Sequence, residues 1–234
     1  MTAADSMARR LAAVQQRIRE ACASAGRAED SVALLPVSKT FSADAVREAH
    51  ALGMSRFGEN KTQEIRQKAA ELDALDLRWV MIGHLQTNKA KDVARDVAEV
   101  QSLDRIDLAD ALQTRLAAAG REIDVLVQVK TSPEESKFGL APDALPAFLA
   151  HLAAHCPALR VQGLMTMAIN SDDSAAVRAC FRLLRELRDA HRSAAVPLAR
   201  LSMGMSGDFE LAIEEGSTEV RIGSAIFGAR HYDH

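Results

Sequence analysis

The fold of this chain is most tightly restricted by a strict alternation of short apolar runs with amphipathic helical segments. The apolar run at 32–37 is typical of a strand buried on both faces, and Ser42 caps a helical pattern over 43–52. A helical pattern at 6–25, ended by Gly26, precedes this first pair. Seven further strand segments follow, at 56–58, 79–82, 97–102, 123–129, 159–165, 200–203 and 220–223. The first helical segment between these strands ends at about 72. The others span 86–94, 105–119, 143–155, 174–192 and 208–215, and a short turn closes the series.

Strands that alternate strictly with helices pair in parallel through right-handed crossovers. Eight such units in 234 residues fit one closed (β/α)8 barrel, for which about 250 residues is typical. We therefore predict a single α/β TIM-barrel domain over 1–234, with an extra N-terminal helix within 1–26 and a tail at 231–234. A doubly wound open sheet is the alternative, but Lys39 and Thr40 occupy the turn where its Gly-x-Gly-x-x-Gly signature would stand.

Charge and cysteine content exclude several classes of protein. Lys plus Arg number 29 against 32 Asp plus Glu, a net charge of -3, so no broad positive field exists to hold nucleic acid or an anionic membrane. No apolar run approaches the ~18 residues of a membrane span, and the run at 11–14 is too short for a secretory signal. The three cysteines, Cys22, Cys156 and Cys180, form no Cys-x-x-Cys pair, so we expect reduced core thiols and no metal site. The sequence therefore predicts a cytoplasmic protein.

Polar residues follow several predicted strands, at the ends where active sites of this barrel class lie. The candidates are Lys39, Asn60, His84, Ser206, Arg221, Gly223 and Ser224. Loops after the seventh and eighth strands form the recurrent phosphate site of the barrel, which predicts phosphate binding by Ser206, Gly223 and Ser224. The alternative is that these residues only cap helices.

Lys39 and Arg221 could carry chemistry at this end of the barrel. Lys39 closes an apolar strand, where a half-buried amine is less readily protonated and can form a Schiff base, although solvated cations at strand ends are common. Arg221 lies between two apolar residues and should point into the barrel mouth, toward either a structural carboxylate or a ligand. His84 and Asn60 are weaker candidates, because a core hydrogen bond or a helix cap explains each of them.

Several short sequence motifs are typical of one family. They are V-S-K-T at 37–40, F-G-E-N at 57–60, I-G-H-L-Q-T-N-K at 82–89, S-K-F-G at 136–139, G-L-M-T-M at 163–167, L-S-M-G-M-S-G-D at 201–208 and V-R-I-G-S-A-I-F-G-A-R at 220–230. With these motifs the chain resembles the pyridoxal phosphate homeostasis protein family from Leu11 to Arg230, and its barrel resembles that of fold-type III pyridoxal 5′-phosphate (PLP) proteins such as alanine racemase. Two positions depart from the family pattern, since Lys61 stands where relatives usually have Tyr and Val80 where His is frequent.

The resemblance implies that the cofactor is PLP and that Lys39 holds it as a Schiff base. The other implied binding residues are Ser206 with the amides of Gly223 and Ser224 at the phosphate, Arg221 at the pyridine nitrogen and Asn60 beside the ring. Members of the family are understood as PLP carriers or regulators of vitamin B6 pools without established catalytic turnover. The resemblance therefore implies a protein of PLP homeostasis that is not an enzyme.

A physical argument agrees with a non-catalytic role. An arginine that donates to the pyridine nitrogen disfavours protonation of that nitrogen and leaves the ring a poor electron sink. The alternatives are a racemase-like PLP enzyme that uses His84 or a substrate-borne base, and an aldolase-type barrel that uses Lys39 without a cofactor. Racemases add a tyrosine base from a second domain of the partner subunit, whereas the one tyrosine here is Tyr232 and we expect no further domain after the barrel. The expected partners are PLP, amino acids through transimination and PLP-dependent apo-enzymes, with no nucleic acid and no membrane, and we expect a monomer.

Overall fold

The computed structural model describes residues 6–229, so the predicted tail at 231–234 and Tyr232 lie outside the described residues. The strands are β1 (Ala33–Pro36), β2 (Arg56–Glu59), β3 (Arg78–Met81), β4 (Glu99–Leu103), β5 (Ile123–Gln128), β6 (Leu159–Met165), β7 (Arg200–Ser202) and β8 (Glu219–Ile222). The α-helices are α1 (Met7–Ser24), α2 (Ala43–Ala51), α3 (Thr62–Glu71), α4 (Ala90–Asp96), α5 (Ile106–Ala118), α6 (Leu145–His155), α7 (Ser174–His191), α8 (Phe209–Glu214) and α9 (Ser224–Phe227). Short 3-10 turns, η2 (Thr87–Lys89) and η3 (Pro142–Ala144), lead into α4 and α6 where the sequence predicted uninterrupted helices.

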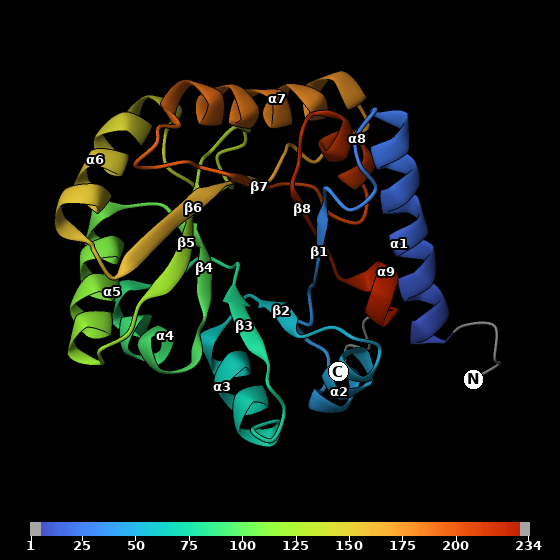
Figure 1. Cartoon of the computed structure of the whole chain (residues 1–234), viewed down its shortest axis with the longest axis horizontal. Helices are drawn as coiled ribbons and strands as arrows, with labels where there is room; N and C mark the ends of the chain where they lie inside the picture. Colours follow the sequence, from blue (N-terminus) through green and yellow to red (C-terminus); the bar gives the residue numbers. More distant parts are fainter. Residues whose placement is uncertain (1–5, 230–234) are drawn as a thin grey trace.

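All the strands pair in parallel in one eight-stranded sheet, in the order β1-β8-β7-β6-β5-β4-β3-β2. The two ends of this order meet at a parallel bridge between Val37 and Gly58, where the Ser38 N–H donates to the Gly58 carbonyl at 3.0 Å. Figure 1 shows the resulting ring of strands with helices around it. The predicted (β/α)8 barrel is confirmed, and the open doubly wound sheet is excluded because β1 contacts both β8 and β2.

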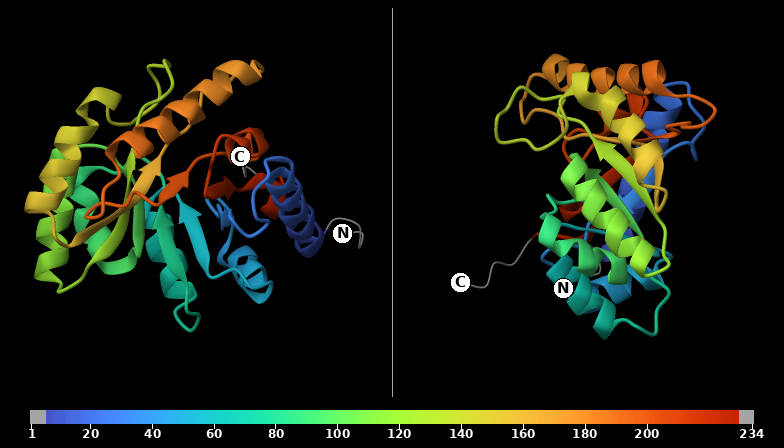
Figure 2. Two further views of the ribbon diagram at one scale, coloured as in Figure 1. Left: turned by 45° about the horizontal axis from the view of Figure 1, so that its top comes forward. Right: turned by 90° about the vertical axis from the view of Figure 1, so that its left-hand side faces the viewer.

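The predicted N-terminal helix is also confirmed, and it covers the last helices of the chain. The Ser6 side chain caps α1 by accepting a hydrogen bond from the Arg9 N–H, and the buried stripe of α1 includes Leu11, Val14 and Ile18 at helical spacing. Figures 1 and 2 show α1, in blue, beside α8 and α9, in red. The Arg10 Nε donates to the Ile226 carbonyl at 2.8 Å, so α1 is tied to the segment that follows β8.

The main apolar layer lies between the strands and the surrounding helices. Its largest fully buried side chains include Phe57, Phe148, Phe181 and Phe209, which come from both strands and helices. Each helix turns one apolar stripe toward the sheet, which is why the helical segments show a period of three and four residues. Across residues 6–229, none of the helices combines the length and the apolar character that crossing a membrane requires.

Inside the barrel, the amino ends of the strands carry a layer of charged side chains, in which two buried carboxylates meet two half-buried arginines. Arg56 donates to Glu99 at 2.8 Å and to Glu219 at 2.9 Å. Arg200 donates to the same two carboxylates, at 2.8 and 3.0 Å. Gln101 lies next to this layer and donates to Glu99 at 2.7 Å. The four charged groups cross-link β2, β4, β7 and β8, a network that the sequence analysis did not identify because its members are far apart in the chain.

Candidate ligand-binding site

The carboxyl ends of the strands enclose a pocket of about 540 Å³. All six predicted binding residues line it, namely Lys39, Asn60, Ser206, Arg221, Gly223 and Ser224. His84, the weaker candidate, lines the same pocket. The barrel thus brings together side chains from segments that the sequence places far apart, while their individual roles in binding stay predictions.

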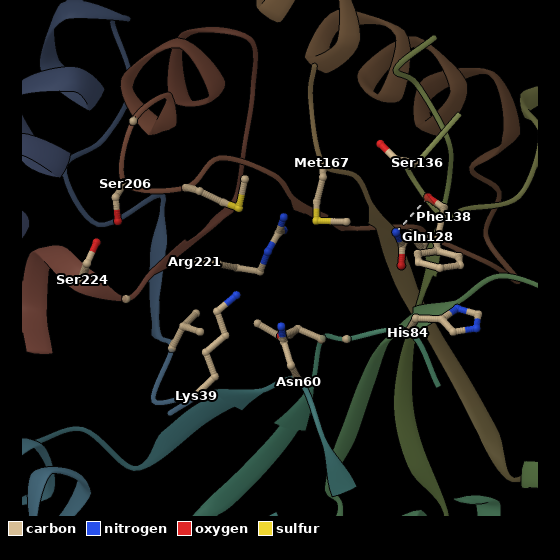
Figure 3. A pocket seen from close by; sticks show the side chains of 16 residues that line it. Lys39, Asn60, His84, Gln128, Ser136, Phe138, Met167, Ser206, Arg221 and Ser224 are labelled. Atoms are coloured by element: carbon tan, nitrogen blue, oxygen red, sulfur yellow. Dashed lines mark hydrogen bonds between the residues drawn. The ribbon is translucent and has the colours of Figure 1, made fainter. Parts of the chain in front are cut away.

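The two sides of the pocket differ in chemistry, as Figure 3 shows. On one side the Lys39 side chain points into the pocket near Arg221, and the hydroxyls of Ser206 and Ser224 face one another. On the opposite side the ring of Phe138 stacks on His84, with centroids 4.0 Å apart. A ligand with a polar end and a flat body therefore meets complementary groups on both sides.

Arg221 forms part of the pocket wall and is held from behind by two hydrogen bonds. Its guanidinium donates to Ser202 Oγ and to the Thr166 carbonyl, both at 2.8 Å. Burial lowers the pKa of Arg221 to about 10, with Glu219 and Asp208 opposing that effect. The group therefore stays protonated at neutral pH, and its remaining N–H donors can serve a ligand. The predicted orientation toward the barrel mouth is confirmed, and the acceptors that hold the guanidinium are a hydroxyl and a carbonyl.

Lys39 and Asn60 follow the neighbouring strands β1 and β2, and a glycine lets the loop after β3 pack closely against Asn60. Val37 on the Lys39 segment donates through its N–H to the Ile222 carbonyl of β8 at 2.8 Å. After β3, a Cβ atom on Gly83 would lie 2.7 Å from the Asn60 Cα, closer than a Cβ atom approaches non-bonded backbone atoms. Only glycine therefore lets the loop after β3 pack against Asn60 and hold it at the pocket.

The loops after β7 and β8 supply the hydroxyl side of the pocket. Gly204 has a φ of +101°, and a Cβ there would lie 2.7 Å from the Ala212 Cβ, so the turn after β7 requires glycine. Asp208 closes this turn by accepting a hydrogen bond from the Met205 N–H at 2.6 Å, and Ser206 lies within it. Burial raises the pKa of Asp208, although the charges of Arg221 and Lys137 oppose the rise. Gly223 passes close to the end of β1, since a Cβ on it would lie 3.2 Å from the Val37 carbonyl oxygen.

The electrostatic character of the pocket favours an anionic ligand. Lys39 and Arg221 contribute cationic groups to the lining, and Ser206 and Ser224 contribute hydroxyl donors. None of the described residues that line the pocket is an aspartate or a glutamate. An anion such as a phosphate monoester meets donors and positive charge there, without a carboxylate in the wall to repel it.

Several lining residues were not identified as binding candidates from the sequence. Gln128 donates through Nε2 to the Phe138 carbonyl at 3.0 Å and so ties the loop after β5 to its strand. Phe138 is 52% exposed and covers the His84 side of the pocket. Met167 and Met205 also line the pocket, where methionine side chains can form the floor for a flat ligand. The sequence signal that could have indicated Phe138 is an aromatic residue in the segment between a predicted strand and a predicted helix, where loops are usually exposed.

Away from the pocket, the structure brings together a thiol, an imidazole and a carboxylate that the sequence did not connect. The ligand-type atoms of Asp110, His151 and Cys156 all lie within 4.8 Å of one another. Asp110 already accepts hydrogen bonds here, from His151 at 2.7 Å and from the Cys156 thiol at 3.7 Å. Burial, together with the Asp110 charge, raises the pKa of Cys156 to about 11. These three side chains therefore form a polar contact between α5 and the end of α6.

A family model and known proteins match this chain over nearly its whole length. A family model described as the alanine racemase N-terminal domain matches residues 10–231. The pyridoxal phosphate homeostasis protein of Aquifex aeolicus is 45% identical over 224 residues, which is 95% of this chain and 98% of the relative.

Solved structures give the same comparison in three dimensions. The structure of PipY from Synechococcus elongatus PCC7942 with PLP bound matches with a TM-score of 0.82 at 35% identity, covering 95% of this chain and 100% of that chain. An alanine racemase of Clostridium difficile 630 matches with a TM-score of 0.72 at 15% identity, covering 99% of this chain and 58% of that chain. The second likeness concerns the barrel fold alone.

Proposed function

Because the chain belongs to the pyridoxal phosphate homeostasis protein family, which has the fold of the alanine racemase N-terminal domain, we propose that its pocket binds PLP and serves PLP homeostasis. The observation that carries this proposal is the donor set of the pocket. A primary amine, a guanidinium and two hydroxyls line one cavity in which no described lining residue is acidic. PLP needs these groups, because it carries an aldehyde, a ring nitrogen and a phosphate.

When bound, PLP supplies an aldehyde that a primary amine can capture reversibly. Lys39 is the one lysine that lines this pocket within the described chain, and we assign the capture to its amine. Ser206 and Ser224, whose hydroxyls line the pocket, would donate to the phosphate, and the Gly223 segment would let the phosphate approach the backbone closely. Asn60 directly follows β2 and lines the pocket, where its side chain would lie beside the ring.

Arg221 argues for binding without turnover. The group is protonated at neutral pH, since burial lowers its pKa only to about 10. A guanidinium facing the pyridine nitrogen donates a hydrogen bond and does not deliver a proton, so the ring withdraws electrons weakly. We therefore propose a protein that holds and releases PLP and does not transform amino acids.

Release requires a second amine that takes the aldehyde from Lys39. The rim of the pocket is open, because Ser224 is exposed and Lys39 is only partly buried. We propose amino acids and the active-site lysines of PLP-dependent apo-enzymes as the recipients. We also propose a cytoplasmic monomer, which is supported by the six proposed binding residues lining one pocket of one chain and by three free cysteines that fit a reducing compartment.

The test is to add PLP to the purified protein, record the visible absorbance of the captured aldehyde, reduce with borohydride and map the labelled peptide. We expect the label on Lys39 and no visible band in Lys39→Ala. Lys91→Ala, on the exposed face of α4, is the matched control and should retain the band. A label on another lysine, or a protein that stays colourless with excess PLP, would overturn the proposal. Exchange of the α-hydrogen of added amino acids at an enzyme-like rate would overturn its non-catalytic part.

A further inference from the structure

The residues on both sides of Lys39 are held by side chains that lie behind the pocket. The Ser38 hydroxyl donates to Glu59 Oε1 at 2.6 Å, and the Ser38 carbonyl accepts from Lys68 Nζ at 2.8 Å. On the other side of Lys39, the Thr40 N–H donates to Glu64 Oε2 at 2.8 Å. The backbone that carries the proposed reactive amine is therefore fixed immediately before and immediately after Lys39.

These contacts belong to one cluster between β2 and α3. Lys68 Nζ lies 2.6 Å from Glu59 Oε1 and 3.5 Å from Glu64 Oε2, so a single ammonium group joins both carboxylates. Ser38 and Glu59 are fully buried, and Lys68 is 5% exposed. Glu59 and Lys68 do not line the pocket, which places the cluster outside the ligand's reach.

Thr40 adopts a conformation that needs such support. Its φ of +68° lies in the left-handed region, which non-glycine residues rarely occupy. Backbone in this region is costly and persists where surrounding contacts fix it, often at functional sites. The hydrogen bond to Glu64 is the contact that holds the Thr40 N–H in this orientation.

We propose that Glu59, Lys68 and Glu64 are positioning residues, which set the direction of the Lys39 amine through Ser38 and Thr40. This inference rests on the proposed function of Lys39 and adds residues that act on it from outside the pocket. A displacement of a reactive group by about 1 Å can cost about a hundredfold in rate, so small movements of this segment matter.

Stability alone is a poor explanation for the cluster. Glu59 Oε2 is buried and finds no hydrogen-bond partner within residues 6–229. Burial raises the pKa of Glu59, and the charge and hydrogen bond of Lys68 only partly offset the rise. Buried ion pairs are often no more stabilising than apolar residues of the same volume. Glu59 contacts Ser38, the residue before Lys39, and its burial is explained by the position in which it holds that backbone.

The experiment compares aldehyde capture with phosphate binding in the same variants. The capture rate is measured by stopped-flow absorbance with PLP, and phosphate binding by calorimetry with pyridoxine 5′-phosphate, which has an alcohol in place of the aldehyde. Positioning predicts that Glu64→Ala slows capture roughly ten- to a hundredfold, while the affinity for pyridoxine 5′-phosphate changes less than about twofold. Glu64→Gln retains an oxygen that accepts from the Thr40 N–H, so it should restore most of the rate.

The buried pair is tested with Lys68→Met and with the double variant Glu59→Gln/Lys68→Met, which leaves no buried charge unpaired and keeps the partly exposed Glu64 beside the Thr40 N–H. The double variant should fold as stably as the wild type and still capture the aldehyde slowly. Glu215→Gln is the matched control, because it disrupts the contacts of a buried carboxylate with Arg182 and Arg185, none of which lines the pocket. Equal losses of capture and phosphate binding, or full capture rates in the Glu64→Ala and double variants, would overturn the inference. A wild-type protein that captures no aldehyde would instead refute the proposed function itself.

Discussion

The Arg221 guanidinium donates to Ser202 Oγ at 2.8 Å, and Ser202 in turn donates to Gln101 Oε1 at 2.6 Å. Gln101 donates to Glu99 and to Glu219, the two carboxylates of the charged layer. A continuous chain of hydrogen bonds therefore connects the pocket wall to the amino end of the barrel. The chain of hydrogen bonds holds Arg221 through protein groups alone, so the position of the guanidinium is fixed by the barrel.

Ser202→Ala should separate the orientation of Arg221 from the rest of the pocket. The change leaves Arg221 and Gln101 each without one buried partner, which should lower the free energy of unfolding by about 1–3 kcal/mol. PLP affinity should also fall, as measured by equilibrium titration. Ser217→Ala is the control, because Ser217 is buried and donates to the Met203 carbonyl without contacting Arg221. Unchanged PLP affinity in Ser202→Ala would show that the chain of hydrogen bonds does not orient Arg221 for binding.

Gly83→Ala should displace Asn60. The added methyl group would overlap the Asn60 backbone, which predicts a loss of about 1–3 kcal/mol in the free energy of unfolding and weaker PLP binding. Gly207→Ala is the matched stability control, because a Cβ there meets nothing within 4 Å. Thermal unfolding by circular dichroism measures both variants. Equal unfolding temperatures for Gly83→Ala and the wild type would contradict the close packing of this loop.

The charged layer of the barrel predicts a specific pH dependence. Burial by itself would raise the pKa of Glu99, but hydrogen bonds and charges from Arg200 and Arg56 outweigh it and lower the pKa below the ordinary value of 4.5. A carboxyl group with a lowered folded-state pKa contributes stability above pH 4.5, and that contribution is lost as pH falls through the folded-state pKa. Glu99→Gln should cost about 3–5 kcal/mol at neutral pH, because it breaks a buried pair.

The measurement for this pH dependence is the unfolding temperature of both proteins from neutral pH down to the acid transition. The difference between wild type and Glu99→Gln should be constant above pH 4.5 and shrink below it. A difference that grows toward acid pH would contradict the assignment of a lowered pKa to Glu99.

The thiols should be unreactive in the native protein. Cys22, Cys156 and Cys180 are free and buried, and burial with the nearby Asp110 charge raises the pKa of Cys156 to about 11. A disulfide reagent at mildly alkaline pH should therefore modify none of the 3 cysteines before unfolding and all of them in denaturant. Rapid modification of Cys156 in the folded protein would show that α5 and α6 separate at this point.

The fold of this chain was largely determined by local patterns. Strands such as β6 (Leu159–Met165) are short runs that end in buried residues, and helices such as α7 (Ser174–His191) have an apolar period of three and four residues, so both could be assigned without knowing their neighbours. The strict alternation then left few topologies, and the barrel was the one that fitted the length. The 3-10 turns before α4 and α6 were not predicted, because helix ends depend on local backbone hydrogen bonds that the apolar period does not report.

For the candidate pocket too, some residues could be predicted from the sequence and others only from the tertiary structure. Lys39, Ser206 and Arg221 could be named from the sequence, because they stand at strand ends inside recognisable motifs, and the structure places them around one cavity. The charged layer of Glu99 and Glu219, and the contacts of Glu59 and Lys68 with Ser38, were decided only by the tertiary structure. A buried charge is stable only beside its partner, and those partners lie on other strands and helices, so no pattern along the chain reveals the pairing.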